Sequence, residues 1–335
     1  MTFDPLSAGT VLRSRYKIIQ RIGQGGMGCL YQAEDLRLPG RWCAVKEVLD
    51  DVRAAAEVRV QAQEQFQREA STLARLDHPN LPKVSDYFSV GERYYLVMDF
   101  VPGNDLRSLI EAARQEGRYL SENEVLRWAQ QLAEALEYLH GQDPPVVHRD
   151  IKPSNLRLTP AGILKLVDFG LVKVMAPDER TITVVRGQGT VAYTPLEQYG
   201  GDSGHTDIRS DIYAFGATLY HLLTNTPPVD AKQRFLRPSC LTPPRVLNPA
   251  ISARVEQAIL WAMALHPDER PNNVAVFRQA LRPESGLNVF SNGSVLIVQP
   301  TIRLPAVSTL VDRYLTLAAA ALLLLALILT LFPVP

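Results

Sequence analysis

Along the first hundred residues, apolar and polar positions alternate in short runs, and turn-forming residues separate these runs. This pattern is typical of β-strands. Strands are predicted over residues 16–22, 29–35, 42–49 and 94–100. Before the last of them, residues 60–76 follow a helical period that places Phe66, Leu73 and Leu76 on one face. The N-terminal part is therefore expected to be rich in strands and to contain one helix.

After residue 100 the apolar positions recur at helical spacing instead. Helices are predicted over residues 105–115, 121–140, 210–224 and 251–265. A strand-rich part followed by a helix-rich part is typical of the α+β class. We therefore expect an α+β body of two lobes, with a small β-rich N-lobe and a larger helical C-lobe.

The C-terminal end carries a different pattern. Residues 314–332 are 19 consecutive residues without a charge, and alanine and leucine fill every face of a helix through them. Such a helix is ~28 Å long, close to the ~30 Å hydrocarbon core of a bilayer. The alternative is a buried core helix, but such helices rarely exceed about 14 unbroken apolar residues. The sequence thus predicts a transmembrane helix at 314–332, preceded by a juxtamembrane linker at 283–313.

The flanking charges suggest an orientation for this span. Arg303 and Arg313 precede it, which favours a body on the cytoplasmic side. Three residues follow the span in the sequence. The expected arrangement is a single-pass, tail-anchored protein of the cell membrane with its folded body in the cytoplasm.

Composition limits the possible classes of protein. The 335 residues include 35 lysines and arginines against 35 aspartates and glutamates, and 46% are hydrophobic, as in ordinary globular proteins. Zero net charge argues against a protein that binds nucleic acid. The three cysteines form no metal-ligand pattern and cannot all pair, which excludes a disulfide framework and favours a reducing cytosol.

A glycine cluster follows the first predicted strand. Gly23, Gly25 and Gly28 allow a tight turn and let backbone N–H groups approach phosphate oxygens, where a Cβ atom would obstruct. A dinucleotide-binding fold uses the same spacing, but it requires a helix after the glycines. Here residues 29–33 continue as a strand. We therefore predict a glycine turn between two strands that covers a nucleotide.

A lysine in a neighbouring strand is the next candidate. Lys46 lies in an apolar strand, where an ammonium group is costly unless an anion pairs with it. Glu69 on the following helix is the predicted partner, and Glu64 is the competing choice. The alternative is that Lys46 is an edge residue that points into solvent and that Glu69 is a solvated helix charge.

The strongest signal is the segment Val146–Asn155. Asp150 could accept the proton of an attacking hydroxyl, Lys152 could neutralise a phosphoryl group, and Asn155 offers an oxygen to Mg²⁺. Thirteen residues later an apolar strand ends at Asp168, whose carboxylate suits a hard cation. Each residue alone could cap a turn or a helix, but so many functional groups in this order are not an accident of composition.

These motifs resemble the eukaryotic-like (Hanks-type) serine/threonine protein kinases of bacteria, here in a membrane-anchored form. The resemblance covers residues 16–282. It implies the two-lobed protein kinase fold, with ATP as substrate in the cleft and Mg²⁺ (or Mn²⁺) as the metal. Lys152, two residues after Asp150, resembles the serine/threonine branch, and the segment Gly189–Tyr193 agrees with it.

The resemblance also assigns roles to single residues. Asp150 is the expected base, Lys152 steadies the γ-phosphate, and Asn155 and Asp168 hold the metal. Lys46 is expected to contact the α- and β-phosphates while it pairs with Glu69. The positions implied to contact ATP are Ile22, Gly23, Gly25, Gly28, Leu30, Ala44, Lys46, Met98, Asp99, Val101 and Asp105. Met98 would be the gatekeeper, residues 99–101 the adenine-binding hinge, and Asp105 a ribose contact.

Some positions concern regulation or depart from the family pattern. Thr181 and Thr183 lie in the expected activation segment, and we hypothesise that their phosphorylation orders this segment against Arg149. Pro195-Leu196-Glu197 stands where the family has Ala-Pro-Glu, and Arg270 is the expected buried partner of Glu197. Tyr213 stands where tryptophan is frequent, between Asp211 and Gly216, which match the family.

The predicted function is transfer of the γ-phosphoryl group of ATP to serine or threonine hydroxyls of proteins, with autophosphorylation of the activation segment. The expected partners are protein substrates, the membrane, and a second copy of the chain for phosphorylation in trans. One alternative is a membrane-tethered pseudokinase that binds nucleotide as a scaffold. Pseudokinases typically lack one of four groups, and Lys46, Asp150, Asn155 and Asp168 are all present. A small-molecule phosphotransferase is disfavoured because residues 189–197 resemble a peptide-binding loop.

Overall fold

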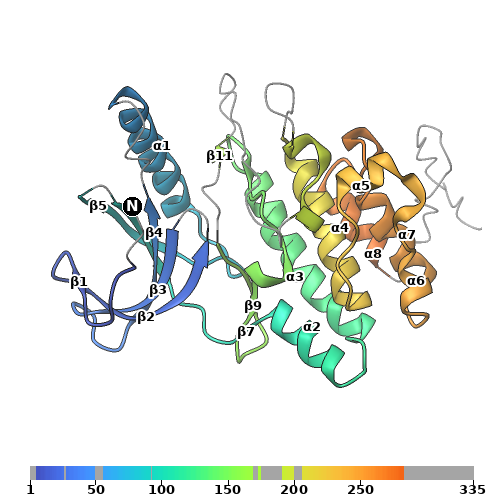
Figure 1. The fold of residues 1–335 in the computed structure, drawn as a ribbon, viewed down its shortest axis with the longest axis horizontal. Helices are drawn as coiled ribbons and strands as arrows, with labels where there is room; N and C mark the ends of the chain where they lie inside the picture. Colours follow the sequence, from blue (N-terminus) through green and yellow to red (C-terminus); the bar gives the residue numbers. More distant parts are fainter. Residues whose placement is uncertain are drawn as a thin grey trace, which may run out of the picture. The chain divides into compact units, whose positions relative to one another are not determined.

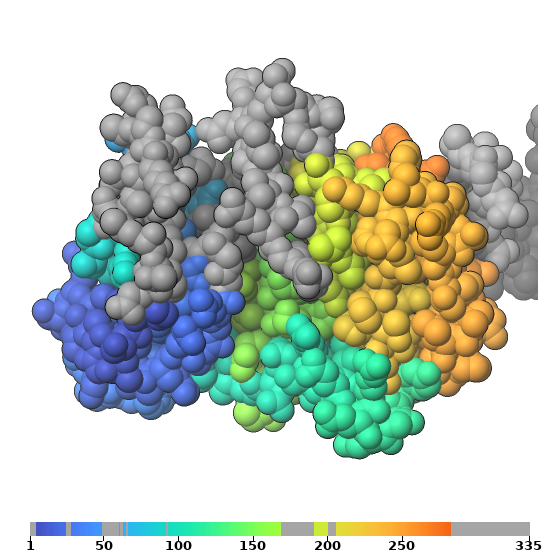
Figure 2. Space-filling model, viewed as in Figure 1, coloured from blue at the N-terminus to red at the C-terminus, as the bar shows by residue number. Residues whose placement is uncertain are grey.

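In the computed structural model, a strand-rich lobe is followed along the chain by a helix-rich lobe (Figure 1). The structure describes residues 5–25, 28–49, 56–91, 93–168, 173–174, 191–199 and 206–282. All of them belong to one unit of the chain, Met1–Leu287, whose two lobes adjoin in the space-filling view (Figure 2).

The N-terminal lobe is an antiparallel sheet with one long helix. Its strand order is β1-β2-β3-β4-β6-β5. The strands are β1 (Val11–Leu12), β2 (Tyr16–Gly25), β3 (Gly28–Asp35), β4 (Trp42–Leu49), β5 (Val84–Val90) and β6 (Arg93–Asp99). Helix α1 (Ala56–Arg75) packs beside β5 and buries Phe66 and Leu73, as its predicted apolar face requires.

The two faces of this sheet bury different clusters, because successive side chains of a strand point to opposite faces. One face carries Tyr16, Tyr31 and Val97 in a cluster of its own. The other face carries Val48 and Leu96, which pack with α1 and belong to a cluster that continues into the helical lobe. The second face therefore joins the sheet to the rest of the unit.

A short segment after β6 crosses from the sheet to the helical lobe. It ends in β7 (Asn104–Asp105), which pairs with β9 (Leu156–Leu158), and β9 pairs with β10 (Leu164–Leu166). Gly103 has φ +104° in this segment, and a Cβ atom on it would lie 2.0 Å from the carbonyl oxygen of Leu158. Only glycine fits this close approach.

The C-terminal lobe is built on helices. They are α2 (Leu106–Gln115), α3 (Glu122–His140), α4 (Ile208–Thr224), α5 (Ala231–Leu236), α6 (Pro244–Leu247), α7 (Ala253–Ala262) and α8 (Val274–Leu281). Helix α4 is buried on nearly every face and lies at the centre of this lobe. A Cβ atom on its Gly216 would lie 2.8 Å from the Cβ atom of Ala262, so the glycine allows α4 and α7 to cross closely.

The short elements near the lobe boundary carry the remaining motifs. They are β8 (Val146–Val147), the 3₁₀ turns η1 (Pro153–Asn155), η2 (Val191–Tyr193), η3 (Leu196–Gln198), η4 (Pro238–Cys240) and η5 (Pro267–Glu269), and β11 (Lys173–Val174). Strand β11 pairs with β8.

The predicted long strands and helices agree with this fold. The elements that were not predicted are the strands β1, β5, β7, β8, β9 and β11 and the helices α5, α6 and α8. β5 was not predicted, because its burial follows no regular alternation along Val84–Val90. The predicted linker at 283–313 and span at 314–332 lie outside the described residues. Within the described part of the chain, no helix is both long and apolar enough to cross a membrane.

Candidate active site

The loop between β8 and η1 brings the first three candidate residues together. The Asp150 carboxylate accepts hydrogen bonds from Lys152 Nζ at 2.7 and 2.8 Å, and from Asn155 Nδ2 at 2.9 Å. Asn155 Nδ2 also donates to the Asp150 carbonyl oxygen at 2.8 Å. Arg149 reaches this geometry with φ +66°, a left-handed conformation that non-glycine residues adopt mainly at functional or tightly constrained positions.

One buried carboxylate of α4 holds this loop. Asp211 accepts a hydrogen bond from His148 N at 2.8 Å and another from Arg149 N at 2.7 Å, and His140 Nε2 lies 2.9 Å from it. Burial acts to raise the pKa of Asp211, but its bonds with His140 and the loop outweigh this, so the pKa falls below its usual range. The ionised carboxylate therefore fixes the two peptide groups that precede Asp150.

Asp168 and Lys46 form the second part of the site. Lys46 Nζ lies 2.5 Å from Asp168 Oδ1. The Lys46 charge lowers the pKa of Asp168, so the carboxylate is ionised at neutral pH. Asp168 has φ +57°, and the neighbouring Val167 N donates to the Asn155 carbonyl oxygen at 2.8 Å. The two predicted metal ligands therefore come from adjoining segments.

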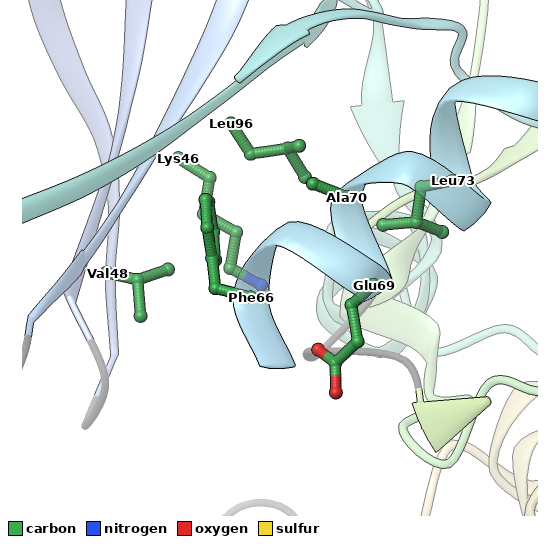
Figure 3. Close-up of a pocket in the computed structure, with 7 residues that line it drawn as sticks. All are labelled: Lys46, Val48, Phe66, Glu69, Ala70, Leu73 and Leu96. Atoms are coloured by element: carbon green, nitrogen blue, oxygen red, sulfur yellow. The ribbon is translucent and has the colours of Figure 1, made fainter. Parts of the chain in front are cut away.

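Glu69 of α1 lies in the same pocket as Lys46. Both side chains line a pocket between α1 and the sheet, to which α1 contributes Phe66, Glu69 and two apolar residues (Figure 3). Glu69 is buried. The structure specifies an ion pair of Lys46 with Asp168. The pair of Lys46 with Glu69 stays a prediction. Burial lowers the pKa of Arg149, and the charge of Glu69 opposes this effect.

The donor set fits a magnesium ion that is shared with a nucleotide. Among the described residues, no group of three or more His, Cys, Asp and Glu side chains is arranged to hold a metal alone. Mg²⁺ commonly takes only one or two protein carboxylates and completes its shell with phosphates and water. Asn155 uses its amide nitrogen for Asp150, which leaves its oxygen for a cation, and Asp168 is ionised.

Several of the predicted ATP contacts lie opposite one another on neighbouring strands of the sheet. In the register of the sheet, Gly23 lies opposite Leu30, and Leu30 lies opposite Lys46. Ala44 lies opposite Met98. Gly28 has φ +149°, and a Cβ atom there would lie 1.9 Å from the carbonyl oxygen of Glu47, so the strand turn requires glycine. Ile22 lies on β2 and is 40% exposed, and Gly25 ends that strand.

Three predicted ATP contacts lie in the hinge segment, Asp99–Asp105. The Asp99 carboxylate accepts from Arg41 Nη2 at 3.3 Å and from Lys83 N at 3.2 Å, and Val101 is buried. Asp105 caps the N-terminus of α2, where its Oδ1 accepts from Ser108 N at 2.8 Å. The carboxylates of Asp99 and Asp105 therefore both hold the segment in place, and one oxygen of Asp105 is already used by its cap.

Sequence reasoning missed one residue at this segment. Arg157 Nε donates to the Val101 carbonyl oxygen at 3.1 Å, and its Nη2 donates to that of Gly103. The available signal was a charged residue two positions after Asn155, between Leu156 and Leu158, in a strand that otherwise reads as apolar.

The end of the predicted activation segment is anchored as expected, although most of the segment lies outside the described residues. Arg270 Nη1 lies 2.6 Å from Glu197 Oε1, and Arg270 Nη2 lies 3.0 Å from Glu197 Oε2. The predicted pair is therefore confirmed. Thr181 and Thr183 are among the residues that the structure does not describe.

A family model for the protein kinase domain matches residues 16–280. The chain belongs to the protein kinase family. The loop between β8 and η1 (the catalytic loop), the strand β4 with Lys46 and the hinge segment thus belong to a two-lobed kinase fold, with a β-rich N-lobe and a helical C-lobe.

Comparison with individual proteins also finds similarity to kinases. A probable serine/threonine-protein kinase of Clostridium acetobutylicum is 35% identical over 272 residues, which are 79% of this chain and 39% of that protein. The tyrosine-protein kinase MasK of Myxococcus xanthus is 32% identical, over 83% of this chain and 44% of its own length. The chain thus spans less than half the length of these relatives. The crystal structure of the Mycobacterium tuberculosis PknI kinase domain has a TM-score of 0.60 at 28% identity, over 82% of this chain and 98% of that one.

Proposed function

We propose that this kinase transfers the γ-phosphoryl group of ATP to serine or threonine hydroxyls of proteins. The observation that carries the proposal is the Asp150 carboxylate, which Lys152 and Asn155 hold by hydrogen bonds. Relatives named serine/threonine-protein kinases, at 35% and 36% identity, support the choice of hydroxyl, as does Lys152 two residues after Asp150.

Each side chain has a step in this reaction. Asp150 orients the substrate hydroxyl and accepts its proton as the oxygen attacks the γ-phosphorus. The Lys152 ammonium, already beside Asp150, offsets the negative charge that spreads over the transferring phosphoryl oxygens. Lys46 binds the α- and β-phosphates from β4. Mg²⁺ or Mn²⁺, held by Asn155 and Asp168, would supply neutralisation of phosphate charge when bound.

The test is transfer by the full chain with Mg-ATP and a generic protein substrate. Asp150→Asn keeps the size of the side chain and removes its basicity, so phosphate transfer should fall by about 10²- to 10⁴-fold. The matched control is Asp77→Asn, because Asp77 is 84% exposed and lies on the surface beside Lys83. Phosphoserine and phosphothreonine would be identified by mass spectrometry.

The competing function is that of a pseudokinase scaffold. ATP binding without transfer, equal in the wild type and in Asp150→Asn, would support the scaffold and contradict the enzyme. Phosphotyrosine as the main product would contradict the proposed substrate class, a relevant outcome because MasK is named a tyrosine-protein kinase.

We also propose that Thr181 or Thr183 is autophosphorylated in trans and that the phosphate binds Arg149. Arg149 supports this proposal because its Nε is buried and has no hydrogen-bond partner among the described residues. A phosphate brings about −1.5 to −2 charge and strong acceptors to such a group. Phosphopeptide mapping after incubation with ATP should find these threonines modified, and less so in Asp150→Asn. Unmodified threonines in an active enzyme would contradict it.

We further propose that residues 314–332 anchor the kinase in the cell membrane, with the kinase domain in the cytoplasm. The uncharged run of 19 residues supports this proposal. Concentration at the membrane surface would also favour phosphorylation between two copies. The full chain should stay in membranes during alkaline extraction, and a Leu324→Lys/Leu325→Lys variant should be released. Equal release of both proteins would contradict the anchor.

A further inference from the structure

Arg157 links the C-terminal lobe to the hinge segment. It lies on β9, directly after the catalytic loop, and its Nε donates to the Val101 carbonyl oxygen at 3.1 Å. Its Nη2 donates to the Gly103 carbonyl oxygen. The planar guanidinium holds two peptide groups at once, because its donors form a rigid fork, and hydrogen bonds from a charged donor are stronger than neutral ones.

The backbone places Arg157 opposite a predicted ribose contact. β7 pairs antiparallel with β9, so that Asp105 lies across from Arg157 and Asn104 across from Leu158. Figure 1 shows β7 and β9 side by side where the sheet lobe meets the helical lobe. The segment that carries Val101 and Asp105 is therefore in register with the strand that begins at the end of the catalytic loop.

Arg157 lies between two leucines that face the core. The neighbouring Leu156 is 1% exposed and belongs to the main apolar cluster, and Leu158 packs against that cluster. Because successive side chains of a strand point to opposite faces, Arg157 lies on the other face of β9, where it is partly exposed. What the arginine adds is the pair of bonds to the hinge carbonyl groups.

We propose that Arg157 is a positioning residue for the nucleoside part of ATP. By holding the peptide groups of Val101 and Gly103, it keeps the hinge in the conformation that receives the adenine and the ribose before ATP arrives. Such preorganisation strengthens binding because the hinge loses less conformational freedom when the nucleotide binds. This inference rests on the proposed ATP-dependent function.

Loss of Arg157 is therefore expected to change the affinity for the nucleoside and the affinity for the phosphates to different extents. The hydrogen bonds of Arg157 go to the hinge, whereas the glycine turn and Lys46 are held by the sheet, so loss of Arg157 should weaken binding of adenosine but not of a polyphosphate. A general loss of folding would weaken both. This difference separates positioning from a merely structural role.

The experiment uses the full chain and three variants. Arg157→Met keeps the length of the side chain without its donors, and Arg157→Lys keeps one charged group that can reach one carbonyl oxygen. The control is Arg118→Met, because Arg118 is 54% exposed and pairs with Glu116 on the surface of the same lobe. The measurements are the Kd for ADP by calorimetry, the KM for ATP, kcat, and inhibition by adenosine and by magnesium tripolyphosphate.

For Arg157→Met we expect the Kd for ADP, the KM for ATP and the inhibition constant of adenosine to rise about tenfold, the loss expected for hydrogen bonds from a charged donor. We expect kcat to stay within about twofold and inhibition by tripolyphosphate to be unchanged. Arg157→Lys should recover part of the adenosine affinity, and the control should match the wild type.

Two results with Arg157→Met would overturn the inference. The first is an Arg157→Met variant with wild-type affinity for adenosine. The second is equal weakening of adenosine and tripolyphosphate. If Arg157→Met does not fold, an Arg157→Lys variant whose adenosine affinity equals that of the wild type and whose kcat alone is reduced would overturn it. A wild type that binds no ADP would instead contradict the proposed kinase function, which keeps the two failures distinct.

Discussion

The Asp211 carboxylate shows how one residue can hold a loop that it does not belong to. It is fully buried on α4, and it accepts hydrogen bonds from the backbone of both His148 and Arg149. Breaking a buried carboxylate's bonds leaves polar groups unsatisfied, which is costly in a low-dielectric interior. The position of Asp150 in its loop therefore depends on a residue of helix α4, 61 positions further along the chain.

A second residue, His221 of α4, makes the stability of the lobe depend on pH. Its Nδ1 lies 2.6 Å from the Tyr193 hydroxyl. Burial and the charges of Arg107 and Arg114 lower its pKa to about 4, against the opposing effect of Glu111. Below the ordinary histidine pKa of about 6.5, the unfolded chain takes up a proton that the folded chain does not. Stability should therefore fall as the pH drops from about 6.5 towards 4.

The prediction compares the wild type with His221→Gln in urea unfolding at pH 7 and pH 5. Between these values the wild type should lose about 2 kcal/mol more of its free energy of unfolding than the variant. His148 is also buried with a lowered pKa, but it is present in both proteins and its effect cancels in the comparison. Parallel pH profiles for the two proteins would show that His221 is not the titrating group.

At the scale of elements, the hinge segment is held from both lobes. Arg41, in the turn before β4, binds the Asp99 carboxylate, and Arg157 on β9 binds the carbonyl oxygens further along. The segment then enters α2 through the Asp105 cap, whose Oδ1 accepts from the backbone and the hydroxyl of Ser108. A segment of a few residues is thus fixed at its start, its middle and its end.

The cap leads to a prediction for α2. Asp105→Ala removes the acceptor for Ser108 N and should lower the free energy of unfolding by about 1 kcal/mol. Asp105→Asn keeps an acceptor oxygen, and asparagine caps helices about as well as aspartate. This variant should therefore lower the free energy of unfolding by only about 0.3 kcal/mol. Urea unfolding followed by circular dichroism measures both. Equal losses in the two variants would mean that the charge of Asp105, and not its cap, provides the stabilisation.

At the scale of the whole unit, one ion pair connects distant parts of the helical lobe. Arg270, after η5, is 0% exposed and makes a bidentate pair with Glu197 of η3. Arg270 also donates to the carbonyl oxygens of Ala264 and Leu265, and Ser210 of α4 donates to Glu197. The pair therefore joins the end of the activation segment to α4 and to the C-terminal helices.

We predict that Arg270→Met lowers the free energy of unfolding by about 3–5 kcal/mol, because it leaves the Glu197 carboxylate, whose side chain is only 10% exposed, without its cation. An Arg270→Met/Glu197→Met double variant removes both charges and should recover part of this loss. Urea unfolding monitored by tryptophan fluorescence measures each variant. A double variant that is no more stable than Arg270→Met would contradict this account.

Much of the fold was predictable because local patterns dominate in it. The alternation along β2, β3 and β4 and the apolar face of α1 follow from the order of residues alone. The kinase resemblance, which rests on the glycine turn, the segment 146–155 and Asp168, is confirmed by the family match. Short segments without a regular period, such as β5, were missed because their burial depends on what packs against them.

The sequence by itself determined which chemical groups are present and in which order: the glycine turn, Lys46, Asp150, Asn155 and Asp168. Their types and spacing are covalent facts that need no folded context. Tertiary structure alone decided which of these groups meet. Lys46 lies against Asp168, and Arg157 reaches the hinge, because packing brings together segments that are far apart in the chain. Such contacts depend on packing between lobes, and the periodicity of a single segment carries no information about them.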